Sequence, residues 1–363
     1  MPRALIVLAL FSACTVRDVT FIGPGVGDAG FMDGPVPGQP MRWLFLLDGS
    51  TIRRVDKNQT TGLLTQSTYS MALPNNQVGI EIVTGKDGVH LYVLQLDPIN
   101  AVGQVSAFQI SATGQLTLVN TVPLQCTSSS MALHPQGGFL VAGCGRQVST
   151  LKINADGSVA APVSVTTQAS GRLIVVINPT GTCVFAGEDG ATSVGVLAFQ
   201  FRTDGTLASA PGTGSPVAND VMVSPTGSHV YLASQATPNS LWVGSIQTTC
   251  GIGTMSSRVA VGANTYEMLA DPSGEYLILT GNDVRTYAIN SAYAEVAGSP
   301  FFAGINYYDA AIDPSVPDKI YLLTIQAGAA AVQVASFSAG VLAMISGSTV
   351  SAGTNSQHFA LAP

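Results

Sequence analysis

Five ionisable side chains recur at equivalent places in a repeated stretch of this sequence. Each stands five residues before the second residue of a four-residue turn. That second residue is usually proline, and the fourth residue is usually glycine. These side chains are Glu81, Asp220, Glu267, Asp309 and His358. Only 10% of the chain is charged, so four carboxyl groups and a histidine at one repeat position favour a shared role.

Carboxylates held close together must be compensated. A cation can bind them, some of them can stay protonated, or backbone amides can donate hydrogen bonds to them. An arc of oxygen ligands suits Ca²⁺ better than zinc, so a calcium site is one expectation. The structural alternative is that these side chains cap strand ends and bond neighbouring repeats. Among the histidines, only His358 is then a candidate for proton transfer.

The turns from which these positions are counted also predict the fold. Asp271-Pro272-Ser273-Gly274 is the clearest copy, and an apolar and aromatic run follows it as a strand. From Gly88 to Gly274, the turn glycines of five successive copies are 49, 44, 46 and 47 residues apart. A second turn, such as Asp156-Gly157, follows an alternating segment and predicts a hairpin. Four antiparallel strands per repeat at this period are typical of an all-β propeller.

The repeats begin near residues 78, 127, 171, 217, 264 and 306, which makes six complete copies. The last residues read as the first strand of a seventh copy, and residues 43–48, 51–56 and 63–68 read as its other three strands. The sequence therefore predicts a seven-bladed ring closed by pairing of the C-terminal strand with the N-terminal blade. In such a ring the five ionisable residues would lie near the mouth of the central channel.

The segment before the propeller has a different character. Residues 1–14 combine Arg3, a short apolar run and small residues before Cys14, which predicts a lipoprotein signal with lipidation at Cys14. Residues 15–40 are rich in Gly and Pro and read as a flexible tether, and residues 41–363 form the propeller. We expect an outer-membrane lipoprotein of the bacterial cell envelope, facing the periplasm or the cell surface and touching the membrane only through its anchor.

Four further cysteines follow the anchor residue. Cys126 and Cys144 stand almost opposite each other across a predicted turn, so they can form a disulfide or remain two half-buried thiols. Cys183 and Cys250 show no evident partner. No zinc-type spacing, nucleophile motif or phosphate loop is present.

The turn and strand motifs, such as D-P-S-G-E-Y-L-I-L from Asp271, resemble the lactonase-like seven-bladed propellers, which include the bacterial 6-phosphogluconolactonase type and the Y-V-T-N repeats. In lactonase members a histidine-rich step precedes one inner strand, and an acidic step follows the next. The matching blade here reads Ser170-Gly171-Arg172 and then Glu188-Asp189-Gly190, without the histidines. The resemblance implies an anion-binding group of Arg172, Glu188 and Arg285.

These observations give two functional expectations. The missing histidines favour a binding platform for a protein or small-molecule ligand, and the resemblance favours a lactone hydrolase with its site at the channel mouth. The net charge is −7 with only 14 Lys and Arg, so nucleic acid is not an expected partner. We expect a monomer.

Overall fold

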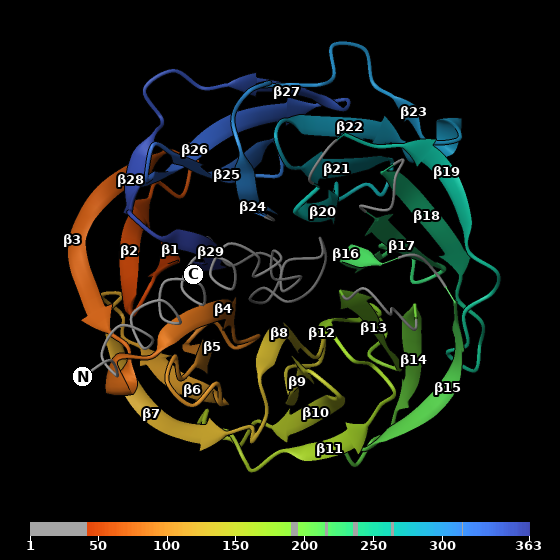
Figure 1. The fold of residues 1–363 in the computed structure, drawn as a ribbon. Helices are drawn as coiled ribbons and strands as arrows, with labels where there is room; N and C mark the ends of the chain where they lie inside the picture. Colours follow the sequence, from red (N-terminus) through yellow and green to blue (C-terminus); the bar gives the residue numbers. More distant parts are fainter. Residues whose placement is uncertain (1–41, 190–194, 215–216, 235–238, 263–264, 314) are drawn as a thin grey trace, which may run out of the picture.

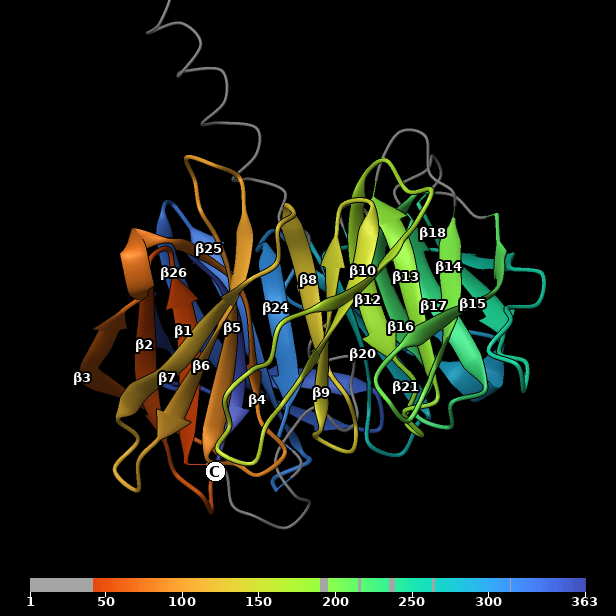
Figure 2. The same cartoon turned by 90° about the horizontal axis from the view of Figure 1, so that it is seen from below.

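The computed structural model describes residues 42–363 except 190–194, 215–216, 235–238, 263–264 and 314. The predicted signal, the lipidation site at Cys14 and the tether therefore lie outside the described residues. Seven antiparallel sheets surround a common axis, as predicted from the repeats (Figure 1). Their strands run between the two faces of the ring (Figure 2).

We number the sheets as blades 1 to 7 along the chain and give each from its innermost strand outward. Blade 1 contains β29 (Ser356–Ala362), β1 (Trp43–Asp48), β2 (Thr51–Lys57) and β3 (Leu64–Ala72). Blade 2 contains β4 (Val78–Thr84), β5 (His90–Leu96), β6 (Gly103–Ile110) and β7 (Leu116–Pro123). Blade 3 contains β8 (Ser128–Leu133), β9 (Phe139–Cys144), β10 (Gln147–Lys152) and β11 (Val163–Thr166). Blade 4 contains β12 (Arg172–Ile177), β13 (Cys183–Asp189), β14 (Val196–Phe201) and β15 (Leu207–Thr213).

The remaining three blades follow the same order. Blade 5 contains β16 (Ala218–Val223), β17 (His229–Ser234), β18 (Ser240–Ser245) and β19 (Ser256–Ala260). Blade 6 contains β20 (Glu267–Ala270), β21 (Tyr276–Thr280), β22 (Val284–Ala288) and β23 (Ala294–Glu295). Blade 7 contains β24 (Tyr307–Ile312), β25 (Lys319–Gln326), β26 (Ala329–Ser338) and β27 (Val341–Met344), and β28 (Val350–Gly353) pairs with β26 as an extra strand. Two short 3-10 turns, η2 (Pro74–Asn76) and η3 (Ile289–Ser291), complete the described elements.

The ring closes as the sequence predicts. Strand β29 pairs antiparallel with β1, so the last strand of the chain becomes the inner strand of the first blade. Lys57 at the end of β2 forms an ion pair of 2.6 Å with Asp313 in blade 7, and neither side chain is exposed to solvent. The Tyr321 hydroxyl of blade 7 also donates to the Gly62 carbonyl oxygen at 2.8 Å. Polar contacts therefore reinforce the closing junction.

The hydrophobic core lies between the blades. Each inner and second strand is buried on both faces, and the apolar clusters are built from neighbouring blades, as in the cluster that joins Phe185 of blade 4 to Leu232 of blade 5. A sheet buried on both faces needs few charges, which accounts for the low charged fraction of the chain. Within the described residues, no helix has the length and apolar character to cross a membrane.

A repeated contact on one face links neighbouring blades. The first residue of the second strand packs on the turn between the third and fourth strands of the following blade, where the turn residue has a positive φ. The pairs that show this contact most closely are His90 with Gly157, Phe139 with Gly205, Tyr276 with Gly340 and Trp43 with Gly114. We call the face that carries these turns the turn face and the opposite one, where the inner strands begin, the entry face.

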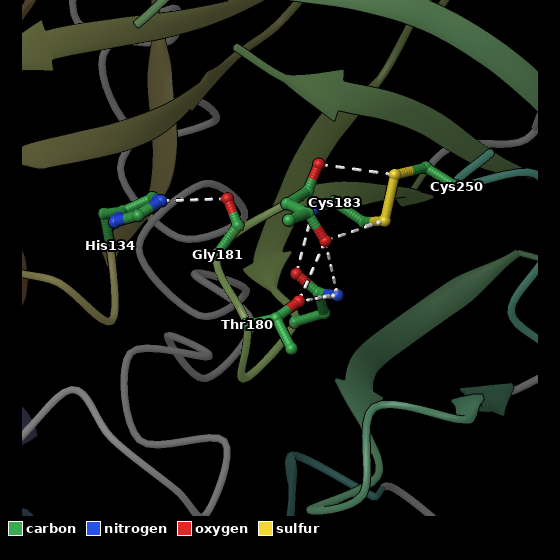
Figure 3. Close-up of a disulfide and its surroundings, with 7 residues drawn as sticks. His134, Thr180, Gly181, Cys183 and Cys250 are labelled. Carbon is green, nitrogen blue, oxygen red and sulfur yellow. Dashed lines mark hydrogen bonds between the residues drawn. A yellow bond between two sulfur atoms is a disulfide. The ribbon is translucent and has the colours of Figure 1, made fainter. Parts of the chain in front are cut away.

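Between blades 4 and 5 this contact is covalent. Cys183 occupies the strand position and Cys250, with φ 64°, occupies the turn position, and the two form a disulfide (Figure 3). The sequence analysis found no partner for these two cysteines, and the structure corrects it. Nearby, Nε2 of His134 in blade 3 lies 2.8 Å from the Gly181 carbonyl oxygen of blade 4, so a hydrogen bond joins the turns of these two blades (Figure 3). A second disulfide joins Cys126 and Cys144, the pair that the sequence offered as one of two possibilities.

Candidate functional site

The residues that stand five positions before the second residue of each repeated turn lie on the inner strands, which surround the ring axis (Figure 1). We call these seven equivalent residues the clasp positions. In ring order from blade 2 they are Glu81, Ser130, Ile174, Asp220, Glu267, Asp309 and His358. All seven are buried, with exposed fractions of 4% or less. The ionisable ones are therefore buried in the inner wall.

A single hydrogen-bond pattern explains this burial. The inner strand of each blade is the edge of its sheet, so some of its backbone N–H groups have no partner within the blade. The side chain at a clasp position accepts a hydrogen bond from the N–H that follows the clasp position of the next blade. The donors and acceptors are Met131 to Glu81 at 2.7 Å, Val175 to Ser130 at 2.8 Å, Met268 to Asp220 at 2.6 Å, Ala310 to Glu267 at 2.7 Å and Phe359 to Asp309 at 2.8 Å. The structural alternative named in the sequence analysis is thus what the geometry supports.

Blade 4 breaks the pattern. Ile174 has no polar atom in its side chain, and the N–H of Val221 in blade 5 bonds instead to Asp220 of its own strand at 2.8 Å. The inner strands that carry Glu81, Ser130, Asp220, Asp309 and His358 each have a β-bulge just before the clasp position, whereas the ladder between β12 and β13 has none. Bulge and clasp bond therefore occur together in blades 2, 3, 5 and 7.

The residue before each clasp position defines a second ring, which we call the rim positions. In blades 2, 3 and 4 these are Ile80, Ser129 and Leu173, which are buried. In blades 5, 6, 7 and 1 they are Asn219, Tyr266, Tyr308 and Gln357, which are partly exposed. The rings of Tyr266 and Tyr308 stack with centroids 4.9 Å apart, and the Asn219 amide donates to the Thr265 carbonyl oxygen at 2.9 Å. A partly exposed arc of aromatic and amide side chains thus covers one side of the inner wall.

Burial sets the protonation of the clasp residues. It raises the pKa of Asp220 well above its ordinary value. It also raises the pKa of Asp309 to about 7, although hydrogen bonds with the Glu267 side chain and the Phe359 N–H act in the opposite direction. Burial lowers the pKa of His358 to about 4, and its Nδ1 lies 3.8 Å from Oδ2 of Asp309. Burial therefore favours the neutral form of each of these three groups.

The geometry does not support a calcium site at the clasp positions. Across the described part of the chain, no three His, Cys, Asp or Glu side chains are grouped so that they could hold a metal ion. The carboxylate oxygens instead accept backbone hydrogen bonds across the blade junctions.

The anion-binding group that the resemblance implied is only partly assembled. Glu188 is fully buried, and its Oε1 accepts hydrogen bonds from the N–H groups of Ser170 at 2.5 Å and Gly171 at 2.7 Å. Arg172 is paired with Asp189 at 2.5 Å. Arg285 lies two blades away on β22, where it pairs with Asp283 at 3.1 Å and Glu295 at 3.2 Å. Each guanidinium is therefore already neutralised, and the three residues do not form one site.

Two features escaped the sequence reasoning. The Cys183–Cys250 disulfide could have been found by aligning the turn between third and fourth strands, since Cys250 stands where other blades have glycine. The stacking of Tyr266 on Tyr308 follows from their equivalent positions in adjacent blades, although the sequence alone gives no direction for either ring.

Comparisons with known proteins agree with this geometry. Residues 47–174 match the model of the family described as lactonase, 7-bladed beta-propeller. No curated protein sequence matches the chain significantly.

Solved structures match over almost the whole chain at low sequence identity. A candidate 6-phosphogluconolactonase from Bacteroides uniformis is 18% identical with a TM-score of 0.70, and the match covers 89% of this chain and 100% of that one. A second one from Bacteroides fragilis is 15% identical with a TM-score of 0.70, covering 91% and 100%. Hydrazine synthase from Kuenenia stuttgartiensis is 15% identical with a TM-score of 0.59, covering 91% and 98%.

Identities this low establish the fold alone, and neighbours with such different names show that the fold does not fix an activity. The described chain is therefore a seven-bladed β-propeller whose residues 47–174 carry the sequence pattern of the lactonase family.

Proposed function

We propose that this protein is a non-catalytic binding platform that takes a small ligand or a protein segment at the entry face. The observation that carries the proposal is the arc of Asn219, Tyr266, Tyr308 and Gln357, where partly exposed aromatic rings and amides lie at the start of the inner strands of adjacent blades. Binding sites combine apolar or aromatic surface with a few polar groups in this way. Tyrosine supplies large contact area and a hydroxyl at low entropic cost.

The state of the ionisable groups supports a role without catalysis. The clasp carboxyl groups and His358 are buried, and the carboxyl groups bond to the backbone across the blade junctions. Arg172 and Arg285 are both engaged by carboxylates of their own blades. A substrate at the entry face would meet the rim residues and not these groups.

We also propose that the protein lies outside the cytoplasm and is tethered to a membrane. Two disulfides support it, since such bonds persist in oxidising compartments and are rare in the cytosol. The tether would be a lipid on Cys14. Metabolic labelling with a clickable fatty acid should mark the wild-type chain and not Cys14→Ser, and absence of label on both would exclude the anchor.

The platform is tested by binding at the rim. We would incorporate 3-fluorotyrosine into the full chain, assign Tyr266 and Tyr308 by Tyr→Phe variants, and titrate monosaccharides, sugar lactones and aromatic carboxylates. At least one class should shift the signals of both tyrosines while leaving Tyr276, which lies on the turn face, unchanged. Equal shifts at all three tyrosines, or no shift with any class, would count against an entry-face site.

A lactone hydrolase is the second candidate, and the family match over residues 47–174 is the observation that favours it. The decisive assay is hydrolysis of a panel of sugar and acyl lactones by the purified chain, with and without Ca²⁺. The platform predicts no turnover above the rate of Glu267→Gln. Turnover that this variant abolishes while staying folded would establish the hydrolase instead.

A further inference from the structure

The exposed rim positions carry polar groups without formal charge. They are two amides and two phenols, from Asn219, Tyr266, Tyr308 and Gln357. The segments that lead into β24 and β29, residues 302–306 and 353–355, are also uncharged, and each of their residues is at least partly exposed. At the start of these inner strands a ligand would therefore meet neutral groups.

The polar atoms of the arc can both donate and accept hydrogen bonds. The Asn219 amide nitrogen donates to the Thr265 carbonyl oxygen at 2.9 Å, which fixes the side chain against blade 6. No described residue donates to its oxygen, which can therefore accept from a ligand. Burial and the neighbouring Tyr308 raise the pKa of Tyr266, so its hydroxyl keeps its proton at neutral pH and can donate.

The two tyrosine rings add flat apolar surface to these groups. Tyr266 and Tyr308 stack with centroids 4.9 Å apart and 13° between their planes, so one ring covers a face of the other. A flat aromatic ligand could lie on an outer ring face but would leave the amides without partners. A pyranose ring uses both kinds of group, because its C–H bonds pack on an aromatic face while the hydroxyls at its edge reach amides and phenols.

The charges around the arc disfavour an anionic ligand. Three arginines at the entry ends of the blades are each paired with carboxylates: Arg53 with Asp48, Arg172 with Asp189, and Arg285 with Asp283 and Glu295. The Arg285 guanidinium lies against Gly262, on the approach to Tyr266, so two carboxylates and one guanidinium give this side of the arc a net negative charge. Arg146, which is exposed on the same face, belongs to blade 3, three blades from either tyrosine. A phosphate or carboxylate would gain no cation at the arc.

We infer that the arc binds a neutral saccharide and discriminates against phosphorylated and acidic sugars. This inference rests on the proposed entry-face site and names the class of its ligand. One pyranose ring packs its C–H face on the tyrosines, and the Asn219 and Gln357 amides at the two ends of the arc bond its hydroxyls. Specificity then comes from shape and neutral hydrogen bonds, without an ion pair.

Matched pairs of sugars test the ligand class on the full wild-type chain labelled with 3-fluorotyrosine. Glucose, galactose, mannose and N-acetylglucosamine are each titrated beside their own phosphate esters. At least one neutral sugar should shift the signals of both Tyr266 and Tyr308, and its phosphate ester should bind about tenfold more weakly or not at all. Added salt should narrow this difference, because it screens the repulsion.

A charge substitution gives the second readout. Gln357→Lys adds a cation at one end of the arc, so the phosphate ester should bind at least as tightly as its parent sugar. Gln168→Lys is the matched control. Gln168 is exposed in the segment between β11 and β12, on the opposite side of the ring, and this variant should keep the preference of the wild type.

The outcomes separate this inference from the site on which it rests. A phosphate ester that shifts both tyrosines and binds the wild type as tightly as its parent sugar would overturn the ligand class and leave the entry-face site standing. Binding of aromatic carboxylates alone would do the same. No shift with any compound would remove the site and the inference together. An unchanged preference in Gln357→Lys with a wild-type unfolding midpoint would show that charge at the arc does not set specificity, which also contradicts the inference.

Discussion

The junction between blades 4 and 5 and the junction between blades 6 and 7 solve the same structural problem with different chemistry. Between blades 6 and 7, the Glu267 carboxyl group crosses the inner wall and accepts the Ala310 N–H. Between blades 4 and 5, Ile174 provides no such acceptor. This junction instead has the disulfide between Cys183 and Cys250 near the turn face.

The difference shows what each junction of the ring requires. An inner strand is a sheet edge in a buried place, so its free N–H groups need acceptors and neighbouring blades need a fixed register. A polar side chain at the clasp position meets both needs. Where that position is apolar, Asp220 satisfies the Val221 N–H from its own strand, and a covalent bond between turns fixes the two blades.

The closing junction between blades 7 and 1 extends this comparison, because it depends on a buried ion pair. Lys57→Met should lower the free energy of unfolding by about 3–5 kcal/mol, since Asp313 would be left as an uncompensated buried charge. Urea unfolding at pH 7 measures this. Adding Asp313→Asn to the same chain should recover part of the loss, and a single variant within experimental error of the wild type would show that the pair does not stabilise the closure.

Removing the covalent link should weaken blades 4 and 5. Cys183→Ala combined with Cys250→Gly, the residue of other blades at this positive-φ turn position, should cost about 2–4 kcal/mol. The Cys126–Cys144 bond spans 18 residues against 67, so its removal should cost about 1 kcal/mol less on loop entropy. Equal midpoints for the two double variants in urea would refute this ordering.

A neutral side chain at a clasp position should contribute less to the free energy of unfolding than the buried ion pair or the disulfide. Ser130→Ala deprives the buried Val175 N–H of its acceptor and should cost about 1–2 kcal/mol. Ser111→Ala, which changes an exposed turn hydroxyl, should stay within about 0.5 kcal/mol of the wild type. Similar unfolding midpoints for both variants would mean that the clasp bond adds no stability.

Much of the fold was predictable because its signals are local. The period of the turn motif, the hairpin glycines and the terminal strand fragments fix the number of blades and the closure, and the structure confirms them. The clasp positions were found by counting from the same turn motif, since equivalent positions in a repeat have equivalent surroundings.

The sequence could not predict the orientation or the burial of individual side chains. The bulge before Asp309 turns its carboxyl group toward the next blade, and nothing in the residues around it distinguishes that course from an exposed one. The partnership of Cys183 and Cys250 depends on contact between repeats, whereas the hairpin argument for Cys126 and Cys144 uses contact within one. Interactions between blades are therefore the part that local patterns miss.

The most direct test of the clasp role compares two substitutions at Glu267 by urea unfolding at pH 6. Gln retains an oxygen acceptor for the Ala310 N–H, whereas Leu has a similar volume and no acceptor. The account predicts that Glu267→Leu loses about 2–3 kcal/mol more than Glu267→Gln. Equal stability of the two variants would contradict it, and would return Glu267 to the group of residues available for a ligand.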